Sequence, residues 1–188
     1  MRRFYLFAVA FLWSLMIHAV TVEIDGIAYY INLKTGLTEV TSNSAHPYSG
    51  DIVIPETIVY EGTQYTVTGI GEKAFFQKNI TSVTFPNSIT SIGASAFMYC
   101  QVLDSIEIPE HVTIIPTDAF ASCQNLKHVK LPEGLTEIGN SAFNSCNGLD
   151  SILIPNTVIT IQDWAFAGCE NLSYVKIPQQ LKTVGQGA

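Results

Sequence analysis

Apolar residues recur over most of the chain in a pattern with one constant period. Cysteine, phenylalanine, proline and isoleucine each return at the same place in successive units of 23 residues. The recurring positions are Cys100, Cys123, Cys146 and Cys169; Phe97, Phe120, Phe143 and Phe166; Pro86, Pro109, Pro132, Pro155 and Pro178; and Ile92, Ile115, Ile138 and Ile161, with Val184 in the same register. Such a period indicates a tandem repeat, in which neighbouring units stack and share one core.

Each unit begins with a pattern typical of a short strand. In the unit 103–125, Ile106 and Ile108 alternate with polar neighbours, as in a half-buried strand. Pro109 follows and ends the strand, because proline lacks the N–H that a ladder needs. A solenoid is therefore the expected architecture, since one unit alone cannot bury its apolar residues.

The rest of the unit predicts a second extended stretch and a turn of helix. Val112 and Ile115 fit the extended stretch. The segment 117–120, Thr-Asp-Ala-Phe, has residues that favour the start of a helix, followed by an aromatic residue. We therefore expect one helical or 3₁₀ turn in every repeat.

The N-terminal stretch 20–50 departs from the period. Residues 22–31 alternate between apolar and polar, and Asp25-Gly26 is a turn signal, so a β-hairpin is expected there. A second strand pair is expected within 31–40. We interpret this stretch as a cap over the first coil, ahead of a solenoid spanning 51–188, in which 59–67 form an inserted hairpin.

The other end of the array has no such atypical unit. Val184-Gly185 aligns with Ile138-Gly139, so the recurring phenylalanine is due at the position after Ala188. The expectation is a solenoid that is incomplete at the C-terminus, either as a fragment or with a frayed last coil.

Residues 1–19 have the features of a secretory signal peptide. Two arginines precede an apolar run that ends near Ala19, and this run is shorter than the roughly 20 residues of a membrane span. Cleavage after Ala19 would remove Arg2 and Arg3, the only arginines, and change the net charge from −7 to −9. Nucleic acid is not expected as a partner, because its binding requires a basic surface. An uncleaved anchor is the alternative.

The sequence predicts no catalytic, cofactor or metal site. Cysteines in one column point the same way, which favours free buried thiols over disulfides and does not converge on a zinc ion. His46, His111 and His128 form no triad-like or metal-binding motif with their neighbours. We therefore expect a protein that is not an enzyme.

The outward strand positions contain the candidate ligand-binding residues. These positions vary from unit to unit, and repeat proteins use such extended faces for binding. The aromatic and cationic side chains gather toward the C-terminal units, and the candidate ligand face consists of His128, Lys130, Leu153, Tyr174 and Lys176. A solvated sheet face without a ligand is the alternative.

The recurring residues resemble those of the BspA-type bacterial leucine-rich repeat. The pattern L-x-x-I-x-I-P-x-x-V-x-x-I-x-x-x-A-F-x-x-C-x-x matches residues 80–188 closely and 52–79 more loosely. No asparagine follows the strand as it does in ordinary leucine-rich repeats. The resemblance implies an α/β leucine-rich-repeat solenoid, a right-handed superhelix with a parallel β-sheet on one face. It also implies a secreted or cell-surface protein, because some members are adhesins for host matrix proteins.

Two functional hypotheses follow. The first is a secreted or cell-surface binding or adhesion module, which recognises a protein or glycan without a cofactor. A host matrix protein is one candidate ligand. After signal cleavage it would not be an integral membrane protein. The second is a structural spacer that presents another domain beyond the C-terminus. The ligand is not specified, because the residues that carry the resemblance are core residues.

Overall fold

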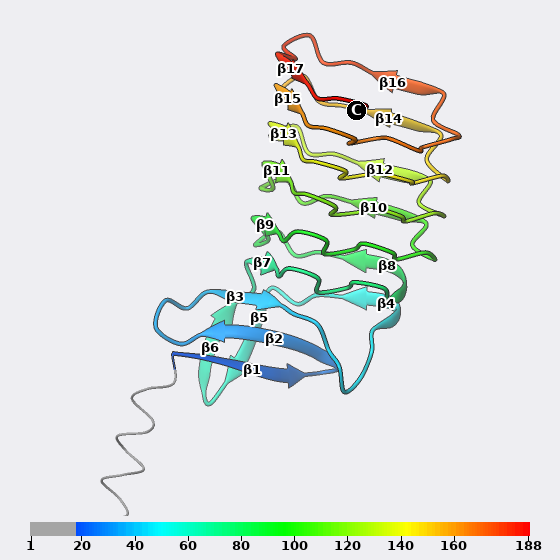
Figure 1. Ribbon diagram of the computed structural model, residues 1–188. Helices are drawn as coiled ribbons and strands as arrows, with labels where there is room; N and C mark the ends of the chain where they lie inside the picture. The colour runs from blue at the N-terminus through cyan, green and yellow to red at the C-terminus, as the bar shows by residue number, and fades with distance from the viewer. Residues whose placement is uncertain (1–17) are drawn as a thin grey trace, which may run out of the picture.

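The computed structural model describes residues 18–188, which form a stack of chain coils above an antiparallel β-sheet (Figure 1). The predicted signal peptide lies almost wholly outside the described residues, and Ala19 is the first residue of β1. The strands are β1 (Ala19–Ile24), β2 (Ile27–Asn32), β3 (Thr38–Val40), β4 (Ser49–Val53), β5 (Thr57–Tyr60), β6 (Thr63–Thr66), β7 (Gly69–Ile70), β8 (Asn79–Thr84), β9 (Ser91–Ile92), β10 (Ser105–Glu107), β11 (Ile114–Ile115), β12 (His128–Lys130), β13 (Glu137–Ile138), β14 (Ser151–Leu153), β15 (Thr160–Ile161), β16 (Tyr174–Lys176) and β17 (Thr183–Val184).

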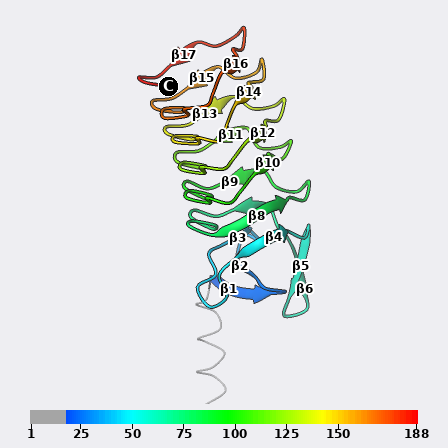
Figure 2. The same cartoon turned by 90° about the vertical axis from the view of Figure 1, so that its right-hand side faces the viewer.

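Each coil contributes one strand to each of two columns (Figure 2). The first column contains β4, β8, β10, β12, β14 and β16, and the second contains β7, β9, β11, β13, β15 and β17. Paired strands are parallel, and equivalent residues of neighbouring coils face each other. Ser105 pairs with His128 in the first column, and Ile115 pairs with Ile138 in the second.

The parallel sheet predicted on one face is interrupted. The strands of the first column form three separate two-stranded sheets, β4–β8, β10–β12 and β14–β16. The second column instead contains a continuous four-stranded sheet, β11-β13-β15-β17. β10, β12 and β14 have only three residues each, and a proline is the second residue after each strand. Such short strands offer few ladder bonds, and the proline removes a further donor.

The segment after the second strand of each coil is a run of tight turns, so the predicted helical turn is wrong. No helix occurs within residues 18–188. Asp118 has a φ of 55°, in the left-handed region that a right-handed helix excludes. Ala119 N–H closes a turn on Pro116 O at 3.2 Å, but Phe120 N–H donates to Ala142 O of the next coil at 2.8 Å. The aspartate that favours a helix start in sequence here occupies a turn position, which Asp also tolerates.

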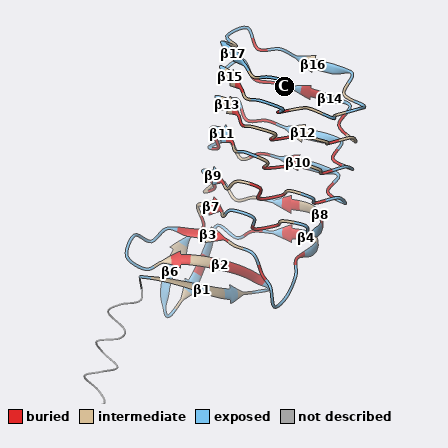
Figure 3. Cartoon of the chain, in the orientation of Figure 1, coloured by how far each residue is buried: buried red, intermediate tan, exposed pale blue. Residues whose placement is uncertain are grey.

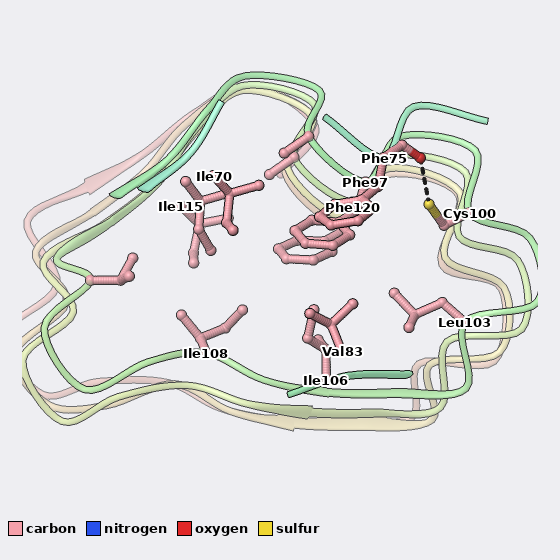
Figure 4. Packing of buried hydrophobic residues seen from close by; sticks show 14 of the residues in the cluster. Ile70, Phe75, Val83, Phe97, Cys100, Leu103, Ile106, Ile108, Ile115 and Phe120 are labelled. Atoms are coloured by element: carbon pink, nitrogen blue, oxygen red, sulfur yellow. Dashed lines mark hydrogen bonds between the residues drawn. The ribbon is translucent and has the colours of Figure 1, made fainter. Parts of the chain in front are cut away.

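The core between the columns is built from ladders of identical residues (Figure 4). The phenylalanine rings of successive coils stack from Phe75 to Phe166, with centroids 5.1 to 5.4 Å apart. Offset stacks at this distance are favourable for aromatic rings. The cysteines are free, and each thiol donates to a phenylalanine carbonyl, as from Cys123 Sγ to Phe97 O at 3.1 Å.

The N-terminal sheet covers the first end of this core. β1 and β2 form the predicted hairpin, with Asp25 and Gly26 both at positive φ in its turn. β2 pairs with β3, and β3 pairs in parallel with β7, so the five-stranded sheet β1-β2-β3-β7-β9 joins the cap to the second column. Tyr48 ends the aromatic ladder, with its ring centroid 4.9 Å from that of Phe75. Its hydroxyl donates to Thr41 O at 2.6 Å, which satisfies the polar end of a buried ring.

The inserted hairpin predicted within 59–67 is also present. β5 and β6 pair with each other as an antiparallel two-stranded sheet beside the cap (Figure 2). No helix in the described part of the chain is long and apolar enough to cross a membrane.

Candidate functional site

In the first strand column, exposed residues alternate with buried ones along the strands (Figure 3). The central residue of each three-residue strand points inward, as Ile106 does in β10 and Ile152 in β14. The flanking residues point outward because side chains alternate along a strand. All five candidate ligand-face residues, namely His128, Lys130, Leu153, Tyr174 and Lys176, are exposed. The candidate residues are therefore accessible to a ligand.

Three of the five meet at one groove. β12 and β14 are neighbours that belong to different two-stranded sheets, and a hollow of about 450 Å³ lies there. Lys130 of β12, Leu153 of β14 and Lys176 of β16 line it. Leu153 pairs in register with Lys176 and occupies the position of Lys130 one coil later. The leucine therefore lies between these two lysines along the column. Leu153 is 62% exposed, so it presents apolar surface to a ligand at this point of the groove.

The charges around this groove are unevenly compensated. Lys130 Nζ contacts the Glu107 carboxylate of the preceding coil, and this hydrogen bond raises the pKa of the lysine. Within residues 18–188, by contrast, Lys176 has no carboxylate partner, because its strand partner is Leu153, whereas the strand partner of Lys130 is Glu107. Of the two lysines that line the groove, Lys176 is therefore the one more available to a ligand, and it lies beside an exposed apolar side chain.

The other two candidates lie outside this groove. His128 lines a neighbouring hollow with Ser82, Ser105 and Glu107, and Lys130 belongs to the lining of both hollows. Tyr174 is 57% exposed and pairs with Ser151. It stands at the opposite end of β16 from Lys176, with Val175 between them. The structure thus places all five on one face. Lys130 lines both hollows, next to Leu153 and Lys176 in one and next to His128 in the other.

The groove also includes residues that sequence reasoning missed. Glu133 and Asn156 line its edge, each one residue after the proline that ends the strand region. This position carries a polar residue in each unit of the array, so the repeat register contains a signal that could have found them. Both add hydrogen-bonding groups to a groove whose centre is apolar.

The described residues provide little for chemistry other than binding. No group of three or more histidine, cysteine or acidic side chains that could hold a metal lies within residues 18–188. The thiols are poor nucleophiles, because burial raises the pKa of Cys100 to about 12 and raises those of Cys123 and Cys146 as well. His111 lies exposed in a turn, and His46 contacts Glu23 of the cap at 2.9 Å.

The fold and the groove define a stacked-repeat protein with an exposed strand face. The family model for the BspA type leucine-rich repeat region matches residues 68–188 in six copies. The chain therefore belongs to the BspA-type leucine-rich repeat family, as its recurring residues indicate. Among curated protein sequences, none matches it.

Solved structures of bacterial leucine-rich repeat proteins are similar to the chain. The leucine-rich repeat protein from T. pallidum has 24% identity and a TM-score of 0.69, over 88% of this chain and 86% of that one. The protein from Eubacterium ventriosum has 22% identity and a TM-score of 0.65, over 89% of this chain and 48% of that one. The protein from Bacteroides capillosus has 32% identity and a TM-score of 0.50, over 84% and 99%. The first two comparisons support the fold.

Proposed function

We propose that the chain is a non-catalytic binding or adhesion module that takes a protein or glycan ligand on its first strand column. The observation that carries the proposal is the groove between β12 and β14, where Leu153 lies exposed between Lys130 and Lys176. An apolar centre with a few polar groups at its edge is typical of a binding surface. The uncompensated ammonium group of Lys176 favours a ligand with an anionic or hydrogen-bond-accepting group.

The proposal includes the setting in which this surface would operate. We infer a right-handed solenoid of 23-residue repeats, exported through the signal peptide 1–19 and secreted or held at the cell surface. Family membership supports this setting, and the acidic net charge does not favour nucleic acid. A host matrix protein is one candidate ligand.

The test compares binding by the chain and by groove variants to immobilised matrix proteins and to a glycan array. Leu153→Thr combined with Lys176→Gln should reduce binding to whichever ligand is captured by about tenfold or more, because both changed side chains line the groove. Ile114→Thr is the matched control, since Ile114 is also an exposed apolar strand residue, 47% exposed, but lies in the second column.

Equal loss in the double variant and the control would place binding elsewhere on the molecule. Capture of no ligand at all by the unchanged chain would instead favour the second hypothesis, a structural spacer.

A further inference from the structure

A second apolar groove lies at the opposite end of the array, where the cap meets the first coil. Its volume is about 420 Å³, within the range of ligand pockets. Buried side chains of Ile27, Tyr29 and Ile58 form part of its lining, and Val53 and Val59 stand at its rim. These two valines are 67% and 61% exposed, so apolar surface continues out of the groove.

One side of this groove is an unpaired strand edge. β4 pairs only with β8 within the described residues, and the cap hairpin lies on its other side (Figure 1). Ile54 N–H donates to Thr84 O of the β8 strand at 3.0 Å. Since successive backbone groups of a strand alternate in direction, the N–H and C=O of Val53 point away from β8, on the side of the groove. An unpaired edge of this kind is a template for a further strand.

The surroundings of the groove are acidic. Asp25 lines it, and Glu56 lies between the lining residues Pro55 and Thr57. Asp51 of β4 is exposed and accepts hydrogen bonds from the hydroxyl groups of Thr81, at 2.7 Å, and Ser82, at 2.6 Å, both on β8. No lysine, arginine or histidine is among the lining residues. A basic partner is therefore complementary to this end of the molecule.

We propose that this groove binds an extended segment of a partner protein that adds a strand along the free edge of β4. The segment places an apolar side chain against Ile27 and Ile58 and a cationic side chain beside Asp25. Recognition of this type obtains affinity from main-chain hydrogen bonds and specificity from pockets for alternate side chains. The site is separate from the groove between β12 and β14 and does not depend on the function proposed for it.

The probe is a synthetic peptide of sequence KVTVKVT with blocked ends, titrated against the full chain and followed by fluorescence anisotropy and by amide exchange. We expect saturable binding that protects the Val53 amide. The acidic peptide EVTVEVT should bind at least about tenfold more weakly, and this difference should shrink as salt is raised, because charge attraction is screened.

Two conservative variants test the groove without removing the fold. Asp25→Asn keeps a residue that tolerates the positive φ of 50° at this turn and removes the charge. Val59→Thr keeps a β-branched strand residue and removes apolar surface at the rim. Each should weaken binding of the basic peptide by about threefold to tenfold. Leu153→Thr, at the distant groove, is the matched control and should leave binding unchanged.

Three results would overturn the proposal. One is the absence of saturable binding at millimolar peptide. Another is binding that Asp25→Asn and Val59→Thr leave unaltered, or that protects β16 rather than Val53. The third is sedimentation evidence that a second copy of the chain already pairs with β4, in which case the edge serves self-association.

Discussion

Phe120 is stacked on both faces of its ring and is completely buried, so it is a sensitive position in the core. Its centroid lies 5.1 Å from that of Phe97 and 5.3 Å from that of Phe143. Phe120→Ala removes both stacking contacts and leaves a cavity, which should lower the free energy of unfolding by about 3–5 kcal/mol. Chemical denaturation measures this loss. Tyr174→Ala, at an exposed ring, should change it by less than about 0.5 kcal/mol. A loss below about 1 kcal/mol for Phe120→Ala would contradict the stacked core.

The four thiols should differ in reactivity according to their burial. Cys100, Cys123 and Cys146 are fully buried and have raised pKa values, whereas Cys169 is only partly buried. Because the thiolate is the reactive form, alkylation of the native chain at neutral pH should be slow and should modify Cys169 first. Mass spectrometry of the labelled chain measures the order.

After unfolding without reductant, all four thiols should react. Fewer than four modified cysteines would indicate disulfides and contradict the ladder of free thiols. Rapid native modification of Cys123 would show that the inner coils open far more often than their burial implies.

At the residue scale, sequence periodicity predicts the core better than the surface. Ile106, Phe120 and Cys123 recur at a constant spacing because every coil must fill the same space between the same neighbours. Outward positions have no such constraint, so their residues vary. The period therefore locates the face that contains Leu153 and Lys176, but not which of its side chains share a groove.

Glycines at the close approach of two coils are the element-scale feature most sensitive to substitution. A Cβ on Gly139 would lie 2.7 Å from Ile115 O and 2.9 Å from the carbonyl carbon of Pro116. These atoms are backbone and cannot move without separating the coils. Gly139→Ala should therefore destabilise the protein by about 1–3 kcal/mol, measured by chemical denaturation.

Gly134 provides the matched control for this prediction. A Cβ there would meet only Glu110 O, at 3.7 Å, which is an ordinary contact. Neither glycine has a positive φ, so backbone strain does not distinguish the two positions. Gly134→Ala should change stability by less than about 0.5 kcal/mol. Equal effects of the two substitutions would show that the coils can separate without cost.

The strands and hairpins were more predictable than the turn segments. Alternation of apolar and polar residues marks β10 and the cap hairpin, because one face of each must be buried. The segment around Asp118 combines residues that favour both a helix start and a tight turn. Hydrogen bonds to the next coil favour the turn, and those bonds depend on residues 22 positions away, as from Phe120 N–H to Ala142 O. Local propensity contains no information about them.

The pairing of first-column strands could not be predicted for a related reason. β10 and β12 are joined by backbone bonds and by ion pairs, including Lys127 with Asp104 at 2.8 Å. β12 and β14 are equivalent in register but lie in different sheets. The residue pattern is the same at both junctions, so it does not show which neighbours form ladder bonds, and the groove of the candidate site lies where those bonds are absent.

On the scale of the whole molecule, the stack is asymmetric. Its N-terminal end is covered by β1, β2 and β3, whereas its other end exposes core positions. Val184 is 62% exposed, although its ladder equivalents Ile138 and Ile161 are 0% and 4% exposed. The coil formed by β16 and β17 therefore has one neighbour in this structure, and its apolar residues contribute less stability than those of the inner coils.

This asymmetry predicts an order of local unfolding along the array. Residues 173–188 should exchange their amide hydrogens by opening well below the global unfolding free energy, because they lose contacts with a single neighbour when they open. Hydrogen exchange followed by mass spectrometry, on a sample shown to be monomeric by sedimentation, measures the protection of each coil. Protection should fall from the β10–β12 coils toward β17. If residues 173–188 are protected as strongly as 103–146, the last coil is stabilised by its own packing, and the nearest-neighbour account of this stack is wrong.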